Sequence, residues 1–506
     1  MKNNMIVNKV NREIPSNYKP FISSSDYKNH QRVLIDEKKT NNKIIFLKDL
    51  SEVFDILKIK DNDTISFHHH LRNGDFVQNL VSEEIKKRNL KNLHYAPSAI
   101  FPSNAILAEL IKNGNVTSID TNYLNGEVAE VIGKGYLQGP LVMNTHGGRP
   151  RKIEAGELKI DVAFIACPTV DKLGNGYGGI GKAACGSLGY AISDLKYAKK
   201  VVLVTDNLVD TLDRIELDHK YVDIVLVIDS IGDPNGIVSG TTKITKDPIG
   251  LKIANMTAKL LDEIGLIKDG MSMQTGAGGT SLAVASYVKN LMIKKNIKGS
   301  FASGGITGYF VDMQKNNLFE ELHDVQCFDI DAVKSYNENP HHIGMSASKY
   351  ANPYDDPIVD KLDIVILGAT EIDKDFNVNV TTDSYGKIIG GSGGHSDTAH
   401  GAKVSIITTN LIKSRMPIIK DHVTTITTPG EDIDILVCER GIAVNPLRKD
   451  LLALLKNSHL PIKTIDELYE LAHSITGTPK KLERSKEVIG VVEYRDGTVI
   501  DTLYKF

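Results

Sequence analysis

Short apolar runs rich in β-branched residues alternate along the chain with amphipathic stretches of helical period. The runs at 200–206 (KVVLVTD), 221–229 (YVDIVLVID) and 361–369 (KLDIVILGA) are apolar on both faces of a strand. Stretches such as 106–114 (ILAELIKNG) and 282–296 (LAVASYVKNLMIKKN) have helical spacing instead. Strands of this kind that alternate with helices are typical of parallel sheets covered by helices. The pattern therefore predicts an α/β protein with mainly parallel sheets.

The second half of the chain repeats the first. KIDVAFIACPTVDKLGN begins at Lys159 and KLDIVILGATEIDKDFN at Lys361, an offset of 202 residues. SDLKYAKKVVLVTDNLV begins at Ser193 and SDTAHGAKVSIITTNLI at Ser396, an offset of 203. We therefore predict two duplicated open-sheet domains. The ligand site should lie between them, because ligands of such sheets bind beyond the carboxyl ends of the strands.

Three units follow from this repeat. We predict a polar N-terminal extension at 1–50, a first domain at 51–258, and a second domain at 259–506 that includes a C-terminal tail. The extension is rich in Asn, Lys and Ser, and it is interpreted either as a partner-binding arm or as a disordered tail.

Charge and composition exclude several classes of protein. Among 506 residues, Lys and Arg number 60 and Asp and Glu number 63, without a block of like charge. Nothing therefore favours binding to nucleic acid or to an anionic membrane. The chain has no apolar leader and no segment near the roughly 20 apolar residues that cross a bilayer, so we expect a cytoplasmic protein. The four cysteines lack metal-binding spacing and are interpreted as buried thiols.

Five glycine-rich loops follow predicted strands. The loop QTGAGGTS at 274–281 is compatible with a dinucleotide loop, an oxyanion hole or a tight turn, since glycine lets backbone N–H groups approach a ligand. The other four are NTHGGRPR (144–151), GNGYGGIGKAACG (174–186), SGGITGY (303–309) and GGSGGHSDTAHGAK (390–403). Each alone is typical of a structural turn. Together, at equivalent ends of a duplicated sheet, they indicate backbone amides that converge on one cavity.

A basic segment marks the first half but not its counterpart in the second. The stretch TISFHHHLRNGD at 64–75 places His68 and His70 on one face of a strand, with Arg72 close by. It could be a metal site, a set of structural histidines or an anion-binding site. Arg149 could add a second guanidinium for a carboxylate, or it could be an exposed loop residue.

An acidic residue follows one of the buried strands. Glu371 lies just past the run at 361–369, where the other copy has Thr169. It is either a catalytic carboxylate or a solvated residue at a strand end.

Seven ordered blocks between about residue 30 and residue 506 resemble the alpha subunit of citrate lyase. More distantly, the two halves are similar to the paired domains of CoA-transferases, with their sugar-isomerase-like α/β fold. The blocks are TISFHHHLRNGD, QTGAGGTSLAVASY, SGGITGYFVDM, LGATEIDKDFNVNVTT, GGSGGHSDTAHGAK, VTTITTPGEDIDILVCERGIAVNP and VVEYRDGTVIDTLYKF.

The resemblance implies a reaction and its partners. Citrate would replace acetate on a thioester, giving citryl thioester and acetate. The thiol would be that of acetyl-CoA or of the phosphoribosyl-dephospho-CoA arm on an acyl carrier protein, the gamma subunit. A beta subunit would then cleave the citryl thioester. The chain itself should hold no cofactor or metal, and we expect it to be oligomeric.

The resemblance also implies roles for the candidate residues. Many CoA-transferases carry a nucleophilic Glu in a Glu-Asn-Gly-Ile segment, but here the segment reads Ser303-Gly304-Gly305-Ile306. This favours direct attack of a citrate carboxylate on the acetyl carbonyl, through a mixed anhydride, with Glu371 as the alternative nucleophile. The remaining assignments are oxyanion donors at Gly276, Gly278 and Gly279, citrate ligands at His68, His70, Arg72 and Arg149, and contacts to the thioester arm at Gly391, Gly393, Gly394 and His395.

Two rival functions remain at this point. One is a CoA-transferase or thioester hydrolase for another small acid that uses Glu371 covalently. The other is a non-catalytic sensor or scaffold on the same fold, which would leave the basic segment at 64–75 unexplained.

Overall fold

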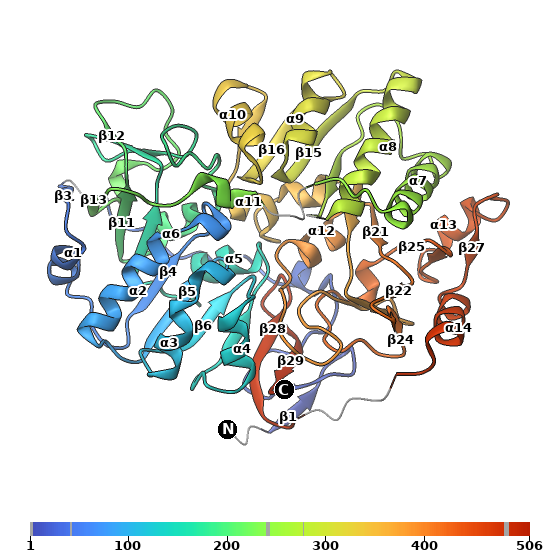
Figure 1. Cartoon of the computed structure of the whole chain (residues 1–506), viewed down its shortest axis with the longest axis horizontal. Helices are drawn as coiled ribbons and strands as arrows, with labels where there is room; N and C mark the ends of the chain where they lie inside the picture. The colour runs from blue at the N-terminus through green and yellow to red at the C-terminus, as the bar shows by residue number, and fades with distance from the viewer. Residues whose placement is uncertain (1–3, 41–42, 239–242, 277, 480–484) are drawn as a thin grey trace.

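Two open sheets, one in each half of the chain, lie side by side with helices packed around them (Figure 1). The computed structural model describes residues 4–40, 43–238, 243–276, 278–479 and 485–506. No helix in these ranges is long and apolar enough to cross a lipid bilayer.

The first sheet has ten strands. Every neighbouring pair in its described part is parallel except β28–β29. In spatial order the strands are β29 (Val499–Tyr504), β28 (Val488–Glu493), β7 (Leu141–Met143), β6 (Val116–Thr121), β5 (Leu93–Pro97), β4 (Thr64–Phe67), β8 (Val162–Ala166), β11 (Lys200–Thr205), β13 (Ile224–Val227) and β3 (Ile45–Leu47).

The second sheet has nine strands and is parallel in its described part except at β25–β26. Its order is β17 (His342–Gly344), β16 (Phe319–Cys327), β15 (Gly299–Ile306), β14 (Met273–Thr275), β18 (Ile364–Leu367), β21 (Val404–Thr408), β25 (Ile435–Cys438), β26 (Gly441–Val444) and β27 (Ile462–Lys463).

The helices follow the amphipathic stretches of the sequence. Five of the described α-helices begin with a side-chain cap, and at the start of α14 Thr464 and Glu467 form a reciprocal capping box. The helices are α1 (Leu50–Leu57), α2 (Val77–Arg88), α3 (Ile106–Lys112), α4 (Glu127–Gly133), α5 (Gly148–Glu154), α6 (Ile192–Tyr197), α7 (Pro248–Glu263), α8 (Gly279–Lys295), α9 (Gly308–Lys315), α10 (Ile330–Glu338), α11 (Ala347–Ala351), α12 (His395–Gly401), α13 (Lys449–Leu454) and α14 (Ile465–Thr476).

The predicted duplication is visible in two small matching sheets. In one, β9 (Thr169–Asp171) pairs antiparallel with β10 (Gly176–Tyr177) and parallel with β12 (Leu208–Val209). In the other, β19 (Glu371–Asp373) pairs in the same two ways with β20 (Val378–Asn379) and β24 (Ile419–Lys420). Asp171 and Asp373 cap equivalent turns, because each carboxylate accepts hydrogen bonds from the backbone amides two and four residues later. The predicted α/β fold of two duplicated, mainly parallel sheets is confirmed.

Three elements cross the proposed boundary between the halves. The strands β28 and β29 come from the C-terminal tail, yet they extend the first sheet by pairing with β7. Helix α7 begins before residue 259, yet it packs against α8 of the second half. The division at 258/259 stays a proposal, and the chain returns to its first half at the end.

The N-terminal segment packs along both halves. Arg12 donates to the carbonyl oxygen of Val423, and Ser24 donates through its amide and hydroxyl to Glu431. Further along, Arg32 pairs with Glu154 and Asp355. The sequence composition indicated an arm or a disordered tail. In the structure, polar side chains of this segment pair with carboxylates on the body of the protein.

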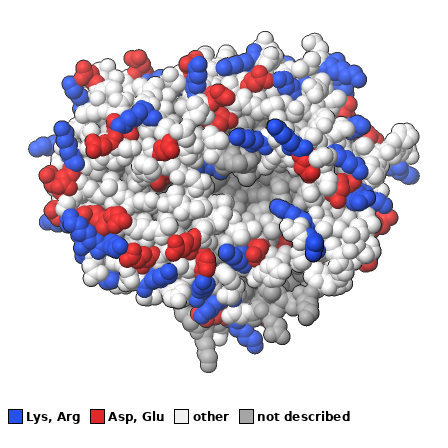
Figure 2. Space-filling view, viewed as in Figure 1, with Lys and Arg blue, Asp and Glu red and all other residues white. Residues whose placement is uncertain are grey.

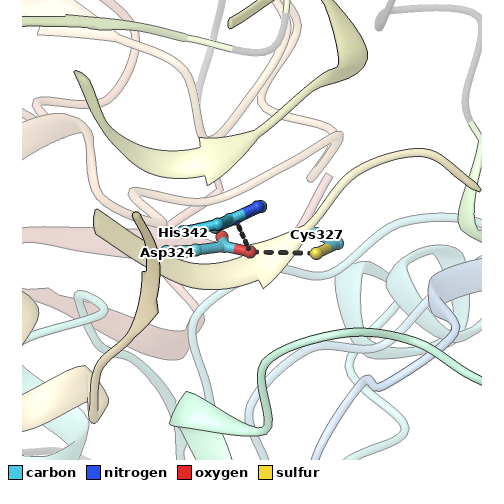
Figure 3. Close-up of side chains that lie close together, drawn as sticks. All are labelled: Asp324, Cys327 and His342. Carbon is cyan, nitrogen blue, oxygen red and sulfur yellow. Dashed lines mark hydrogen bonds and ion pairs between the residues drawn. The ribbon is translucent and has the colours of Figure 1, made fainter. Parts of the chain in front are cut away.

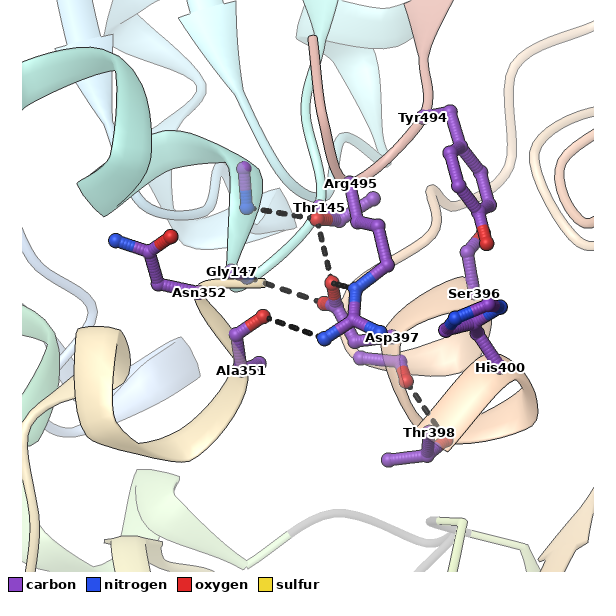
Figure 4. Close-up of polar contacts among 12 residues, drawn as sticks. Thr145, Gly147, Ala351, Asn352, Ser396, Asp397, Thr398, His400, Tyr494 and Arg495 are labelled. Carbon is purple, nitrogen blue, oxygen red and sulfur yellow. Dashed lines mark hydrogen bonds and ion pairs between the residues drawn. The ribbon is translucent and has the colours of Figure 1, made fainter. Parts of the chain in front are cut away.

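A buried carboxylate joins the two halves (Figure 4). Asp397 of α12 accepts a hydrogen bond from Thr145 Oγ1 at 2.9 Å and from the amide of Gly147 at 3.1 Å. Arg495, which follows β28, places Nε 3.7 Å from the same carboxylate and donates Nη2 to the carbonyl oxygen of Ala351. One side chain of the second half therefore holds a loop of the first half and the C-terminal tail together.

Asp397→Asn should change how stability depends on pH. Burial raises the pKa of Asp397 to about 6 from an ordinary value of 3.8. Below about pH 4 both the folded and the unfolded carboxyl are protonated, whereas between about pH 4 and 6 only the folded one keeps its proton. The free energy of unfolding of the wild type should therefore fall, relative to the variant, by roughly 3 kcal/mol as the pH rises through this window. Denaturant titrations at several pH values measure this difference, and a difference that is constant with pH would contradict it.

Candidate active site between the two halves

A pocket of about 410 Å³ opens where strand ends of the second sheet face loops of the first half. Figure 2 shows a hollow near the middle of the face seen in Figure 1, with Lys and Arg side chains along its rim. The lining includes Gln274 in β14, Gly276 and Gly278 after it, Gly305 in β15, Phe328 after β16, Tyr350 in α11, Gly368 after β18, and Gly391, Gly394 and His395 at α12, with His146 and Tyr190 from the first half. The site therefore lies beyond the carboxyl ends of parallel strands, as expected for this class of sheet.

The predicted residues divide into two groups. Six line the pocket, namely Gly276, Gly278, Gly305, Gly391, Gly394 and His395. The other nine lie outside the lining, namely His68, His70, Arg72, Arg149, Gly279, Ser303, Gly304, Glu371 and Gly393.

The two pocket-lining glycines predicted as oxyanion donors use their amides within the chain. Gly276 N–H donates to the carbonyl oxygen of Ile366 at 2.7 Å, and Gly278 N–H donates to that of Gly276 at 2.9 Å. Gly279 lies against residues 243–245, since a Cβ there would be 2.9 Å from the carbonyl oxygen of Lys243. In this conformation, neither Gly276 nor Gly278 has an amide N–H left to offer an oxyanion.

The glycines after β15 make room for other side chains. Gly304 has a φ of 106°, and the pairing register shifts between Gly304 and Gly305. A Cβ on Gly304 would lie 2.6 Å from the Gln274 side chain, and one on Gly305 would lie 2.3 Å from the ring of Phe328. Ser303 is buried in the strand behind them. These residues shape the wall, and the backbone of Gly305 forms part of it.

His68 and His70 do share a face, as the alternation of side chains along a strand predicts, and their ring centroids lie 5.5 Å apart. That face is turned away from the pocket. His68 donates Nε2–H to the carbonyl oxygen of Ala166, and burial lowers its pKa to about 4. His70 places Nδ1 3.4 Å from a carboxylate oxygen of Asp75. Neither histidine is retained as a citrate ligand, because each faces the interior.

Arg149 is also not retained in the carboxylate clamp. Its Nη1 and Nη2 donate to the two carboxylate oxygens of Asp194, both at 2.7 Å, and Nη2 donates to the carbonyl oxygen of Ala96 at 2.6 Å. Arg149 and Asp194 are 2% and 1% exposed, so this pair is closed to a substrate. The bidentate recognition foreseen for Arg149 is real, but the carboxylate comes from the chain itself.

Arg72 is differently placed. Its guanidinium carbon lies 4.6 Å from the ring centroid of Phe328, which lines the pocket, and 5.7 Å from that of Phe101. Among the described residues its Nη1 has no hydrogen-bond partner although it is buried. Burial lowers the pKa of Arg72, yet an arginine stays charged at neutral pH. Arg72 is therefore a cation behind the pocket wall with an unused donor.

Glu371 is buried and already fully engaged. Its carboxylate accepts from the amide and hydroxyl of Thr424, from Ser384 Oγ at 2.6 Å and from Asn379 Nδ2 at 3.0 Å. Four donors hold it in the small sheet of β19, and it does not line the pocket. This placement counts against Glu371 as a covalent nucleophile.

One group of three potential metal ligands occurs among the described residues, Asp324, Cys327 and His342 (Figure 3). Asp324 Oδ2 accepts from Cys327 Sγ at 2.9 Å and lies 3.2 Å from His342 Nε2. Burial raises the pKa of the Cys327 thiol well above its ordinary value, so the sulfur is a neutral donor here. Asp324 Oδ1 accepts from the amides of Gln326 and Ile306, which supports the bulge next to Gly305. The group thus serves as an internal brace for the pocket wall.

Several lining residues were missed by the sequence analysis. The rings of His146 and Tyr190 lie in tilted contact with centroids 4.6 Å apart. His69, the middle histidine of its triplet, is not part of the described lining, but its ring makes a tilted contact with Tyr190 at 4.7 Å. On the opposite wall Gln274 donates Nε2–H to the hydroxyl of Tyr350 at 2.7 Å. The one sequence feature that could have indicated His146 as a pocket residue is its position inside the glycine-rich loop at 144–151.

Arg149→Met should destabilise the fold. Removing one partner of a buried ion pair leaves Asp194 uncompensated, which typically costs about 3–5 kcal/mol. Denaturant titration of the variant measures the free energy of unfolding, with Arg440→Met, at the exposed turn between β25 and β26, as the control. A loss below about 1 kcal/mol would contradict a structural role for the pair.

Comparisons with known proteins agree with this architecture. The family model "Citrate lyase, alpha subunit (CitF)" matches residues 42–506. The citrate lyase alpha chain of Haemophilus influenzae is 46% identical over 449 residues, covering 88% of this chain and 90% of its own. The Escherichia coli K12 chain is 43% identical over 449 residues, covering 88% of each.

Solved structures give the same result. A putative citrate lyase alpha subunit from Streptococcus mutans, in complex with citrate, is 40% identical with a TM-score of 0.94, covering 98% of this chain and 99% of its own. The malonate decarboxylase alpha subunit of Acinetobacter baumannii shares the fold alone, with a TM-score of 0.63 at 15% identity over 88% of this chain and 96% of its own. The family match and these identities lead to one conclusion: the chain belongs to the citrate lyase alpha subunits.

Proposed function

We propose that the pocket between the halves performs the transferase step of citrate lyase, in which citrate replaces acetate on an acetyl thioester. The observation that carries this proposal is the composition of the wall. Among the described lining residues none is Asp, Glu, Lys or Arg. A carboxylate that attacks the thioester must then be brought by the substrate, and citrate carries three.

The reaction balances without a nucleophile from the chain. A citrate carboxylate oxygen attacks the acetyl carbonyl carbon, the C–S bond breaks, and the thiolate leaves, giving a mixed acetyl-citryl anhydride. The thiolate then attacks the citryl carbonyl carbon, the C–O bond breaks, and acetate leaves. The four hydrogen bonds to Glu371 support this route over a covalent glutamyl intermediate.

Arg72 is the proposed partner for a citrate carboxylate. Burying an anion in a neutral wall is costly unless a donor or a cation meets it. Arg72 has a buried donor, Nη1, that lacks a hydrogen-bond partner among the described residues, and its guanidinium packs on Phe328 of the wall. A charge-assisted hydrogen bond of this kind contributes about 1.5–3 kcal/mol.

The loop at α12 is proposed to contact the thioester arm. Gly391, Gly394 and His395 line the pocket, and a Cβ on Gly391 would lie 2.3 Å from the carbonyl oxygen of Asn122. Gly393, just behind this surface, has a φ of 51° that favours glycine. We propose that the arm is that of an acyl carrier (gamma) subunit, and that a beta subunit cleaves the citryl thioester. No cofactor of the chain's own is needed.

Arg72→Met should weaken citrate use and leave the fold intact. We expect kcat/KM for citrate to fall about 10- to 100-fold, mostly through KM, because one charge-assisted hydrogen bond is lost. Citryl-CoA formation from acetyl-CoA and citrate, followed by mass spectrometry, measures the effect against Arg440→Met. Unchanged kinetics in a folded Arg72→Met variant would remove Arg72 from the site.

Oxygen tracing separates the two chemical routes. With citrate labelled by ¹⁸O in its carboxylates and enzyme in excess, the direct route transfers one labelled oxygen to acetate in the first turnover. A glutamyl route gives unlabelled acetate at first and leaves the label on Glu371. Mass spectrometry of acetate and of the peptide containing Glu371 decides between them, and unlabelled first-turnover acetate would rule out the direct anhydride.

A further inference from the structure

His146 lies in the pocket wall on a backbone tied to the opposite half. It follows β7, and its amide donates to the carbonyl oxygen of Gly393 at 2.7 Å. Thr145 and Gly393 also form an isolated parallel bridge. The position of the imidazole is therefore set jointly by a loop of the first half and the loop before α12.

Asn122 selects the tautomer of this ring. Asn122 follows β6 and places its side-chain amide nitrogen 2.9 Å from His146 Nδ1. An amide NH₂ can only donate, so Nδ1 accepts, and the neutral ring carries its proton on Nε2. Asn122 is held by its backbone as well, because its carbonyl oxygen accepts from Gly393 N–H and its amide donates to the carbonyl oxygen of Ser98.

The Nε2 edge faces the loop that contacts the pocket. A Cβ placed on Gly393 would lie 3.2 Å from Nε2, so a side chain there would crowd this edge. Within the described part of the chain Asn122 is the ring's hydrogen-bond partner, and Nε2 has none. Because His146 lines the pocket, its ring offers one unpaired N–H at the pocket wall.

The surroundings keep the ring neutral. The titratable rings in contact with it are Tyr190, tilted at 4.6 Å between centroids, and His69, stacked at 6.2 Å. Burial lowers the pKa of His146 to about 3 and that of His69 well below its ordinary value. Burial also raises the pKa of the Tyr190 hydroxyl well above its ordinary value. None of the three carries charge near neutral pH.

We propose that His146 is a catalytic residue that donates Nε2–H to the oxyanion of the acyl exchange, and that Asn122 is the positioning residue that keeps the proton on Nε2. The inference rests on the proposed function. Both halves of the exchange pass through a tetrahedral oxyanion, and the amides of Gly276 and Gly278 are already used. A neutral donor stabilises charge as it develops at the oxyanion, without binding product acetate as strongly as a cation would.

Asn122→Asp tests the tautomer directly. The new carboxylate must accept, so it draws the proton to Nδ1 and turns a lone pair on Nε2 toward the oxyanion. At pH 8 we expect kcat for citryl-CoA formation to fall about 100- to 1,000-fold, the effect of losing one oxyanion donor, with KM for citrate changed far less. His146→Phe, which removes the donor, should lose a similar factor at every pH.

The pH profile separates this role from a structural one. In Asn122→Asp the carboxylate favours the doubly protonated ring, which again carries a proton on Nε2. Activity of this variant should therefore recover as the pH falls from 8 toward 5.5, whereas neither the wild type nor His146→Phe should show that recovery. Asn115→Asp is the matched control, since Asn115 is a buried asparagine at the other end of β6. Its profile should keep the shape of the wild type.

The outcomes are distinct. If Asn122→Asp works at the wild-type rate with the wild-type profile, the tautomer assignment is overturned. If His146→Phe stays fully active, the catalytic role of His146 is overturned, while the proposed function stands. If the wild type itself forms no citryl thioester from either acetyl-CoA or acetylated carrier protein, the proposed function fails, and the role of His146 fails with it.

Discussion

The carboxylate of Asp397 connects the halves, and the geometry of the pocket depends on it. It accepts hydrogen bonds from Thr145 and from the amide of Gly147, on either side of His146 in the sequence. Gly147 must be a glycine for this approach, because a Cβ there would lie 2.0 Å from the carbonyl oxygen of Ala351. This contact acts together with the N-terminal segment and with the pairing of β28 to β7, which also join the halves, and it fixes the loop that carries His146 against α12.

In the described part of the chain, the pocket lining is uncharged because the charged side chains near it are paired with, or enclosed by, other groups of the chain. Arg149 and Asp194 neutralise each other in the interior, Glu371 is enclosed by donors, and the histidines near the pocket are held neutral by burial. The described lining of the pocket is left without Asp, Glu, Lys or Arg, and the guanidinium of Arg72 lies behind it. Under the proposed function, such a wall would admit an anionic substrate without competing for its nucleophilic carboxylate, so positioning and oriented dipoles would carry the catalysis.

The sequence predicted those features that depend on local pattern. Strand and helix periods gave the α/β class, the repeat gave the duplication, and the glycine-rich loops gave the wall at Gly276, Gly305 and Gly391. Pairing over long sequence distances had no local signal. The alternation of side chains along a strand predicted that His68 and His70 share one face. It could not show that the pocket lies on the opposite face, that of His69.

The same limit applies to Arg149, whose loop predicts a carboxylate partner but whose partner, Asp194, is identified only by the folded chain. It also applies to β28 and β29. The sequence of this C-terminal pair of strands does not indicate which sheet the pair will join.

The return of β28 and β29 to the first sheet has a consequence for biosynthesis. Strand β7 cannot find its neighbour β28 until the long segment between Met143 and Val488 has been made. At about 5–20 residues per second, the open edge of β7 therefore waits on the order of 20 to 70 seconds for its partner. An unpaired strand edge is a site for incorrect association. The timing of β28 synthesis thus determines when the first-made half is safe from aggregation.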